Sequence, residues 1–193
     1  NLKVKHLRLR EFEKFHEVPD EFKGKRIVFI SDLQFDHHLT CFDHLAAKKL
    51  IALIEKQKAD LLIIGGDIIH NHSDCNHLIF NYLKDLKMDK IAILGNHDYR
   101  DLETVLKGLD ESNITLLKNE SYMYHGINIY GCDDFRAGSP KEPSVQEDYS
   151  IVLSHNPDYS MQLKNLNIDL ILSGHFHAGQ ITLFGRYAPA ITS

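Results

Sequence analysis

The chain has 193 residues, of which 43% are hydrophobic and 25% charged, a composition typical of a globular domain. Its 22 basic and 27 acidic residues give a net charge of −5, so the sequence carries no overall basic footprint for nucleic acid, although this does not exclude a local basic groove. No apolar run approaches the ~18 residues needed to span a bilayer. The three cysteines contain no Cys-x-x-Cys pair, which argues against a disulfide framework and favours a reducing compartment.

We therefore expect one domain over residues 1–193, either cytoplasmic or peripheral to the membrane. Because the sequence starts at Asn1 and not at Met, an anchor segment trimmed from the N-terminus stays open as an alternative. Nucleic acid is not an expected partner.

The first half of the chain alternates predicted strands and helices. An alternating, highly charged segment over 3–15 predicts an edge strand. Apolar runs and helical periodicity then predict strand 26–31, helix 42–57, strand 61–65, helix 76–86, strand 90–94 and helix 101–109. This β-α-β order implies a largely parallel sheet with helices on its faces.

The pattern changes after residue 110. Short strands over 114–117, 121–125 and 127–131, the last two joined by a tight turn, predict a second, more antiparallel sheet. Residues 133–149 are polar and predict a long surface loop, a common place for a functional lid. Strand 150–154, helix 158–165, strand 169–173 and a final strand over 180–184 follow.

Five of the predicted strands share one ending, an apolar run followed by a small residue and then by polar residues of metal-ligand type. Parallel strands deliver such residues to one edge of a sheet, where open α/β sheets bind their ligands. The candidates, in chain order, are Asp32 with Gln34, Asp67, Asn96 with His97 and Asp98, His155, and His175 with His177.

Carboxylate, amide and imidazole donors in one set suit Mn, Fe or Zn ions. The set exceeds the needs of one tetrahedral ion, so we predict two divalent ions, with Asp67 as the bridging carboxylate. Two ions ~3.5–4 Å apart lower the pKa of a bridging water and clamp a phosphoryl group for in-line attack. His97, directly after Asn96, could serve as the general acid, and Asp98 could orient its ring.

The segments Asp32-x-Gln34, Gly66-Asp67, Gly95-Asn96-His97-Asp98, Ser154-His155 and Gly174-His175-Phe176-His177 resemble the motifs of the calcineurin-like metallophosphoesterases, in order and spacing, over about residues 26–183. The stretches 131–134, 154–158 and 173–180 are similar to a bacterial membrane-associated branch that includes phosphodiesterases and UDP-2,3-diacylglucosamine pyrophosphohydrolase-like enzymes.

The resemblance implies a four-layer α/β/β/α sandwich of two mixed β-sheets flanked by helices. It implies one ion on Asp32, Asp67 and His177, and a second on Asp67, Asn96, His155 and His175. It makes His97 the catalytic histidine of a phosphodiester or pyrophosphate hydrolase. The implied substrate is a small phosphodiester or a lipid-linked nucleotide, with association at a membrane surface.

Two departures from the family pattern bear on this prediction. The family has His where this chain has Gln34, so the first ion should bind more weakly or favour hard ions. Gln34 could ligate through its oxygen or a water, or Asp36, His37 or His38 could compensate. The sequence also ends at Ser193, soon after the Gly-His-x-His motif, so C-terminal strands of the domain are expected to be missing.

Several alternatives remain open. The protein could be a catalytically impaired metal-binding or interaction module, because of Gln34, or a nuclease, which the acidic balance disfavours. Arg136 could clamp a substrate phosphate or be a plain surface residue. His70, with His72 and His77, could contact substrate or a stray metal ion, or lie in a solvated loop.

Overall fold

The computed structural model describes residues 18–35, 40–144, 149–176, 181–183 and 187–190. The predicted edge strand over 3–15 lies outside these residues. So do His177 and the candidates Asp36, His37 and His38.

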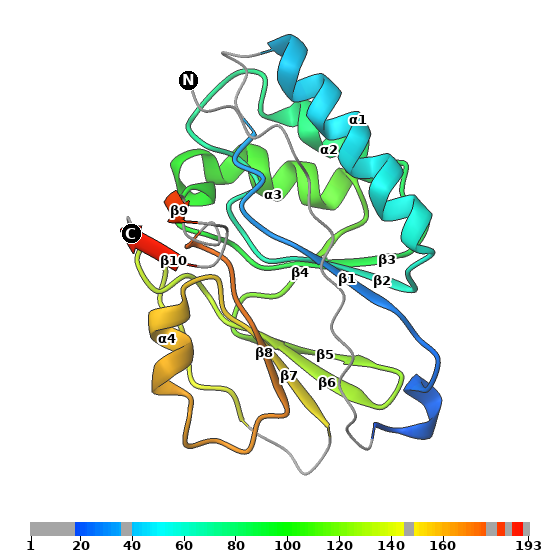
Figure 1. Cartoon of the computed structure of the whole chain (residues 1–193), viewed down its shortest axis with the longest axis vertical. Helices are drawn as coiled ribbons and strands as arrows, with labels where there is room; N and C mark the ends of the chain where they lie inside the picture. The colour runs from blue at the N-terminus through cyan, green and yellow to red at the C-terminus, as the bar shows by residue number, and fades with distance from the viewer. Residues whose placement is uncertain (1–17, 36–39, 145–148, 177–180, 184–186, 191–193) are drawn as a thin grey trace.

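The first sheet has the strand order β1-β2-β3-β4, and all of its pairings are parallel. Its strands are β1 (Ile27–Ile30), β2 (Leu61–Ile64), β3 (Asp89–Ala92) and β4 (Thr115–Leu116). The crossovers pass through α1 (Thr40–Gln57), α2 (His77–Lys84) and α3 (Leu102–Glu111), which cover one face of the sheet (Figure 1). The predicted strand over 114–117 thus extends this sheet and not the second one, because β4 follows α3 as one more right-handed parallel crossover.

The second sheet has the order β5-β6-β7-β8. It contains β5 (Glu120–Tyr124), β6 (Ile127–Gly131), β7 (Ser150–Leu153) and β8 (Leu170–Leu172). The β5–β6 hairpin is antiparallel, and β6, β7 and β8 run parallel, with α4 (Pro157–Gln162) between the last two. This sheet is therefore mixed, with a single antiparallel pair among its described strands. The hairpin turns at His125-Gly126, where both residues have positive φ, as a tight two-residue turn requires.

Alternate residues of each strand face different layers. On the first sheet, Leu62 and Ile64 face the three helices, whereas Leu61 and Ile63 face the second sheet. On the far side of the second sheet, Val152 packs with residues of α4 in a third cluster. The order helix, sheet, sheet, helix confirms the predicted four layers, since period-2 alternation lets each strand serve two cores.

A separate antiparallel pair, β9 (Ile181–Leu183) and β10 (Tyr187–Ala190), follows β8, where we predicted one final strand over 180–184. None of the helices in the described part of the chain is long and apolar enough to cross a membrane.

Candidate metal centre

The predicted ligand residues come from strand ends that lie at one edge of the two sheets. In the first sheet Ile30 pairs with Ile64, and Ile64 with Ala92, so β1, β2 and β3 end level with one another. Leu153 pairs with Leu172 in the second sheet, so β7 and β8 also end together. The segments after these strands are therefore brought to one place, as parallel pairing dictates.

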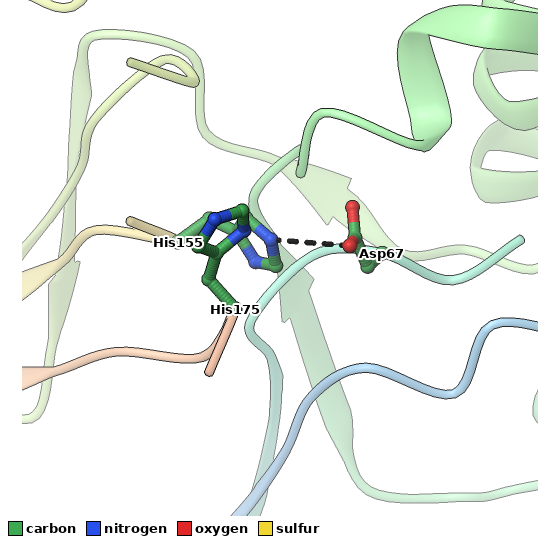
Figure 2. A group of neighbouring side chains, drawn as sticks. All are labelled: Asp67, His155 and His175. Carbon is green, nitrogen blue, oxygen red and sulfur yellow. Dashed lines mark ion pairs between the residues drawn. The ribbon is translucent and has the colours of Figure 1, made fainter. Parts of the chain in front are cut away.

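Asp67, His155 and His175 form the centre of the site. Each offers one ligand atom, and these atoms all lie within 4.8 Å of one another. The Nε2 atom of His155 is 3.3 Å from Oδ2 of Asp67, and the two imidazole rings meet edge to face at 5.2 Å (Figure 2). All three residues are buried, which prepares a desolvated pocket for a cation.

Two ligand-type atoms at this site have no hydrogen-bond partner among the described residues. They are the buried Oδ1 of Asn96 and Nε2 of His175, while Nε2 of His155 faces the carboxylate of Asp67 at 3.3 Å. Burying such atoms unpaired is costly, so each indicates a ligand that satisfies it. A set of one carboxylate, one amide oxygen and two imidazole nitrogens fits a divalent ion of the Mn, Fe or Zn class.

The hydrogen bonds of His155 leave the correct nitrogen available to a metal. Its Nδ1 lies 2.7 Å from the carbonyl oxygen of Gly65, which can only accept, so Nδ1 carries the proton and Nε2 faces the pocket. Burial favours the neutral ring, but the hydrogen bond and the charge of Asp67 outweigh it and raise the pKa of His155 to about 9. Burial likewise opposes ionisation of Asp67, yet His155 lowers the pKa of that carboxyl.

His175 differs from His155 in its electrostatics. Burial, followed by the charges of His155 and Arg136, lowers its pKa below the ordinary value. The ring is therefore neutral near pH 7, which is the form that coordinates metals.

Asp32 and Gln34 also reach this site. Both carboxylate oxygens of Asp32 accept from the backbone N–H of His175, at 3.0 and 3.1 Å, and so fix the segment after β8. The side-chain amide of Gln34 donates to Oδ2 of Asp67 at 3.4 Å. Gln34 therefore lies beside the predicted bridging carboxylate, with its nitrogen and not its oxygen directed at Asp67.

Backbone strain is concentrated among these residues. Asp32, Gln34, Asp67 and His175 all have positive φ, between 43° and 70°, a region that residues with a Cβ rarely adopt. Outliers of this kind cluster at functional sites because the surrounding structure holds them there.

Gly95 allows the segments after β2, β3 and β7 to approach one another closely. A Cβ on Gly95 would stand 2.2 Å from Oδ1 of Asp67 and 2.8 Å from Nε2 of His155. No side chain fits between these two ligands, so the sequence requires glycine directly before Asn96.

Asp98, which we predicted to orient the ring of His97, contacts backbone groups of the loop after β2. Its two oxygens accept backbone N–H groups of Gly95 and residues 67–69, at 2.8 to 3.2 Å. Burial raises the pKa of Asp98 to about 7, and these N–H groups oppose the rise. A carboxylate engaged with the loop after β2 shapes that loop, and the hydrogen bond to the ring of His97 has another source.

That source is His70. Nδ1 of His97 lies 2.5 Å from the carbonyl oxygen of His70, and the two rings stack with centroids 4.9 Å apart. The backbone N–H of His97 donates to Oδ1 of Asp67 at 2.8 Å. Because a carbonyl oxygen can only accept, the proton of His97 lies on Nδ1, and the other ring nitrogen, Nε2, takes no part in this hydrogen bond.

The other histidines of this loop do not join the cluster. His72 lies 3.3 Å from the carboxylate of Asp101, and Nδ1 of His77 lies 2.9 Å from the carbonyl oxygen of Asp74.

The loop after β6 contributes residues that the sequence prediction missed. We expected a surface loop over 133–149, yet Asp133 and Asp134 are buried, and Oδ2 of Asp134 has no partner. Arg136 is exposed, and its charge contributes to the low pKa of His175, so it lies within electrostatic reach of the centre. The position of Asp133 and Asp134 directly after a strand, like that of the ligands, was the available signal.

This α/β/β/α fold, with carboxylate, amide and imidazole donors gathered at the strand ends, defines a metal-dependent phosphoesterase architecture. Residues 25–179 match the family model described as calcineurin-like phosphoesterase. The chain belongs to this family.

Curated relatives agree with the assignment. The chain is 31% identical to metallophosphoesterase YkuE of Bacillus subtilis, over 91% of this chain and 65% of YkuE. It is 31% identical to phosphodiesterase YaeI of Escherichia coli, over 81% of this chain and 62% of YaeI. It is 26% identical to UDP-2,3-diacylglucosamine pyrophosphatase LpxG of Chlamydia trachomatis, over 88% of this chain and 69% of LpxG. The chain thus spans less than two thirds of the length of YkuE and YaeI.

Proposed function

We propose that this protein hydrolyses phosphodiester or pyrophosphate bonds with the help of two divalent metal ions. The observation that carries the proposal is the set of buried ligand-type atoms on Asn96, His155 and His175 around the carboxylate of Asp67, of which those on Asn96 and His175 have no hydrogen-bond partner among the described residues. When bound, two such ions supply a water of lowered pKa and neutralise charge on the phosphoryl oxygens.

The residues around the pocket divide into two groups. Asp67, Asn96, His155 and His175 would hold one ion. Asp67, Asp32 and, from outside the described residues, His177 would hold the other.

His97 would give its proton to the leaving oxygen. Its Nδ1–H is held by the His70 carbonyl, which also stabilises the protonated ring, and so its Nε2 is the donating atom. Through its stacking on His97, His70 would limit the positions that this ring can take.

Gln34 supports a second candidate function. An amide that donates to Asp67 does not bind a cation in that orientation, and rotation about its last bond would be needed to present its oxygen. A protein that holds one ion only, and binds phosphoesters without cleaving them, would follow if Gln34 keeps its present orientation.

The substrate we propose is a small phosphodiester or a lipid-linked nucleotide, in keeping with the names of YaeI and LpxG. For a lipid-linked substrate, the protein would work at a membrane surface. A nuclease is a weaker candidate, because the net charge of −5 gives little attraction for a polyanion.

The experiment compares the protein, loaded with Mn, Fe or Zn, with its His97→Asn variant on bis(p-nitrophenyl) phosphate. His125→Asn is the matched control, since His125 occupies a hairpin turn at positive φ, which Asn tolerates. The proposal expects turnover by the wild type and His125→Asn, and a loss in His97→Asn that reaches 10²-fold or more, on the order of general acid catalysis, when diphenyl phosphate with its more basic leaving group replaces the nitrophenyl ester. No turnover by folded wild-type protein with any of these ions would contradict it, and one bound ion would then favour the second candidate.

A further inference from the structure

A polar link joins the two halves of the molecule beside the metal centre. Tyr99 lies in the short 3-10 helix Asp98–Asp101 (η3), which is capped by His97 and follows β3 of the first sheet. Its hydroxyl donates to Oδ1 of Asp133, which follows β6 of the second sheet. A contact between segments 34 residues apart thus ties the helix of the proposed acid to the opposite sheet.

The accepting carboxylate is built into its own loop. Asp133 is 4% exposed, and its oxygens also accept the backbone N–H groups of Asp134, at 2.9 Å, and Ser139, at 2.8 Å. Lys118 adds charge, with its ammonium 3.8 Å from Oδ2 of Asp133 and 5.2 Å from the centre of the Tyr99 ring. Since so many groups converge on Asp133, it is a fixed point and not a mobile side chain.

From Asp133 the link continues to Arg136. Oδ1 of Asp134 accepts the backbone N–H of Arg136 at 2.8 Å and that of Ala137 at 2.7 Å, which turns the chain tightly at this point. This set of hydrogen bonds therefore runs from the hydroxyl of Tyr99, two residues after His97 in the chain, through Asp133 and Asp134 to the backbone of Arg136.

The phenol of Tyr99 remains a donor in all ordinary conditions. Burial, followed by the hydrogen bond and the charge of Asp133, raises its pKa well above the usual range. The phenol of Tyr99 therefore keeps the proton that it donates to Asp133.

We propose that Tyr99 is a positioning residue, which holds the imidazole of His97 and the guanidinium of Arg136 at a fixed separation so that one phosphoester contacts both. This inference rests on the function proposed above. It assigns to Tyr99 no contact with the substrate. A displacement of about 1 Å in either group should lower kcat strongly, because the reaction requires near-ideal geometry.

The test is Tyr99→Phe, which removes one hydroxyl and keeps the ring. The matched control is Tyr130→Phe, since the Tyr130 hydroxyl donates to the carbonyl oxygen of Lys141 at 3.1 Å, in the same loop but without a connection to His97. Both variants are assayed on bis(p-nitrophenyl) phosphate and on diphenyl phosphate. Phenolate is the more basic leaving group and depends more on a proton from His97.

We expect Tyr99→Phe to lower kcat for diphenyl phosphate about tenfold, and for the nitrophenyl ester by clearly less, with metal content unchanged. Tyr130→Phe should change kcat for neither substrate. Equal losses on both substrates, or no loss, would overturn the proposal. In a His97→Asn background, Tyr99→Phe should cost little more, and a full additional tenfold loss would also contradict a role exerted through His97.

Hydrogen exchange gives a readout that does not need turnover. Amides in 97–101 and 133–141 should exchange faster together in Tyr99→Phe and not in Tyr130→Phe. If wild-type protein is inactive on both esters, the proposed function fails, while coupled exchange would still support the link. Unchanged exchange in both segments of Tyr99→Phe would refute the link, whether or not the wild-type protein is active.

Discussion

Replacing Gly95 by alanine offers a sharp steric test of the metal centre. A Cβ at this position would stand 2.2 Å from Oδ1 of Asp67, 2.5 Å from its backbone nitrogen and 2.8 Å from Nε2 of His155. Ordinary contact begins at 3.4 Å, so the carboxylate would have to move by about 1.2 Å. Metal sites tolerate deviations of only about 0.2 Å in ligand distance, so Gly95→Ala should lower metal affinity at least 100-fold.

The cost to folding should be smaller, about 1 to 3 kcal/mol, because one added methyl group overpacks a single point. Gly24→Ala is the matched control. No atom lies within 4 Å of a Cβ there, but its φ of +80° strains alanine by about 1 kcal/mol. Elemental analysis after gel filtration, together with thermal unfolding, separates the two effects. Wild-type metal content in Gly95→Ala would refute the placement of Asp67 and His155 as joint ligands.

Four further predictions follow from the residues around the metal centre. A metal ion must displace the proton of His155, whose pKa is raised from 6.5 to about 9. Metal affinity should therefore rise about tenfold per pH unit between pH 6.5 and 9. Calorimetry in buffers of different ionisation enthalpy should detect the released proton. The same shift stabilises the metal-free fold below pH 6.5, and this stability should be lost as pH rises through 9; metal-free unfolding midpoints that do not fall over this range would contradict it. Asp98→Ala leaves the N–H groups of Gly95 and residues 67–69 without an acceptor, at a cost of about 1 to 3 kcal/mol each, which the removal of a buried carboxyl partly offsets. Denaturant unfolding should therefore show a loss of at least about 3 kcal/mol in the free energy of unfolding. Unchanged stability with a selective fall in kcat would instead support a role for Asp98 in orienting His97. Gln34→His should tighten the weaker of two metal-binding steps about tenfold in a calorimetric titration, and an unchanged step would show that residue 34 does not ligate.

Much of the site was predictable because each candidate ligand is marked by the residues directly before it in the sequence. A buried strand followed by a small residue and a ligand-type residue places that residue at the edge of the sheet, wherever the strand lies in the order. Asp67, Asn96, His155 and His175 were found by this rule, and the structure brings their segments together. Continuous apolar runs likewise predicted strands with two buried faces, as in β2, whose four residues are all buried.

What the sequence did not reveal depends on contacts between distant segments. Asp98 follows His97 directly, which suggested a pair, but which backbone N–H groups it meets depends on the curvature of the loop after β2. The pairing of Tyr99 with Asp133 spans the two sheets and leaves no trace in local periodicity. The strand over 114–117 was predicted in the second sheet and lies in the first. As β4 it has two residues, which carry too little pattern to indicate its neighbouring strand.

The central claim is that a pair of cations occupies the pocket around Asp67. Crystals of the protein grown with Mn or Zn, with diffraction collected on either side of the metal absorption edge, would test it most directly. We predict one anomalous peak bonded to Asp67, Asn96, His155 and His175, and a second on the Asp32 side of the Asp67 carboxylate. Ions located only elsewhere, or none at full metal concentration, would contradict the account.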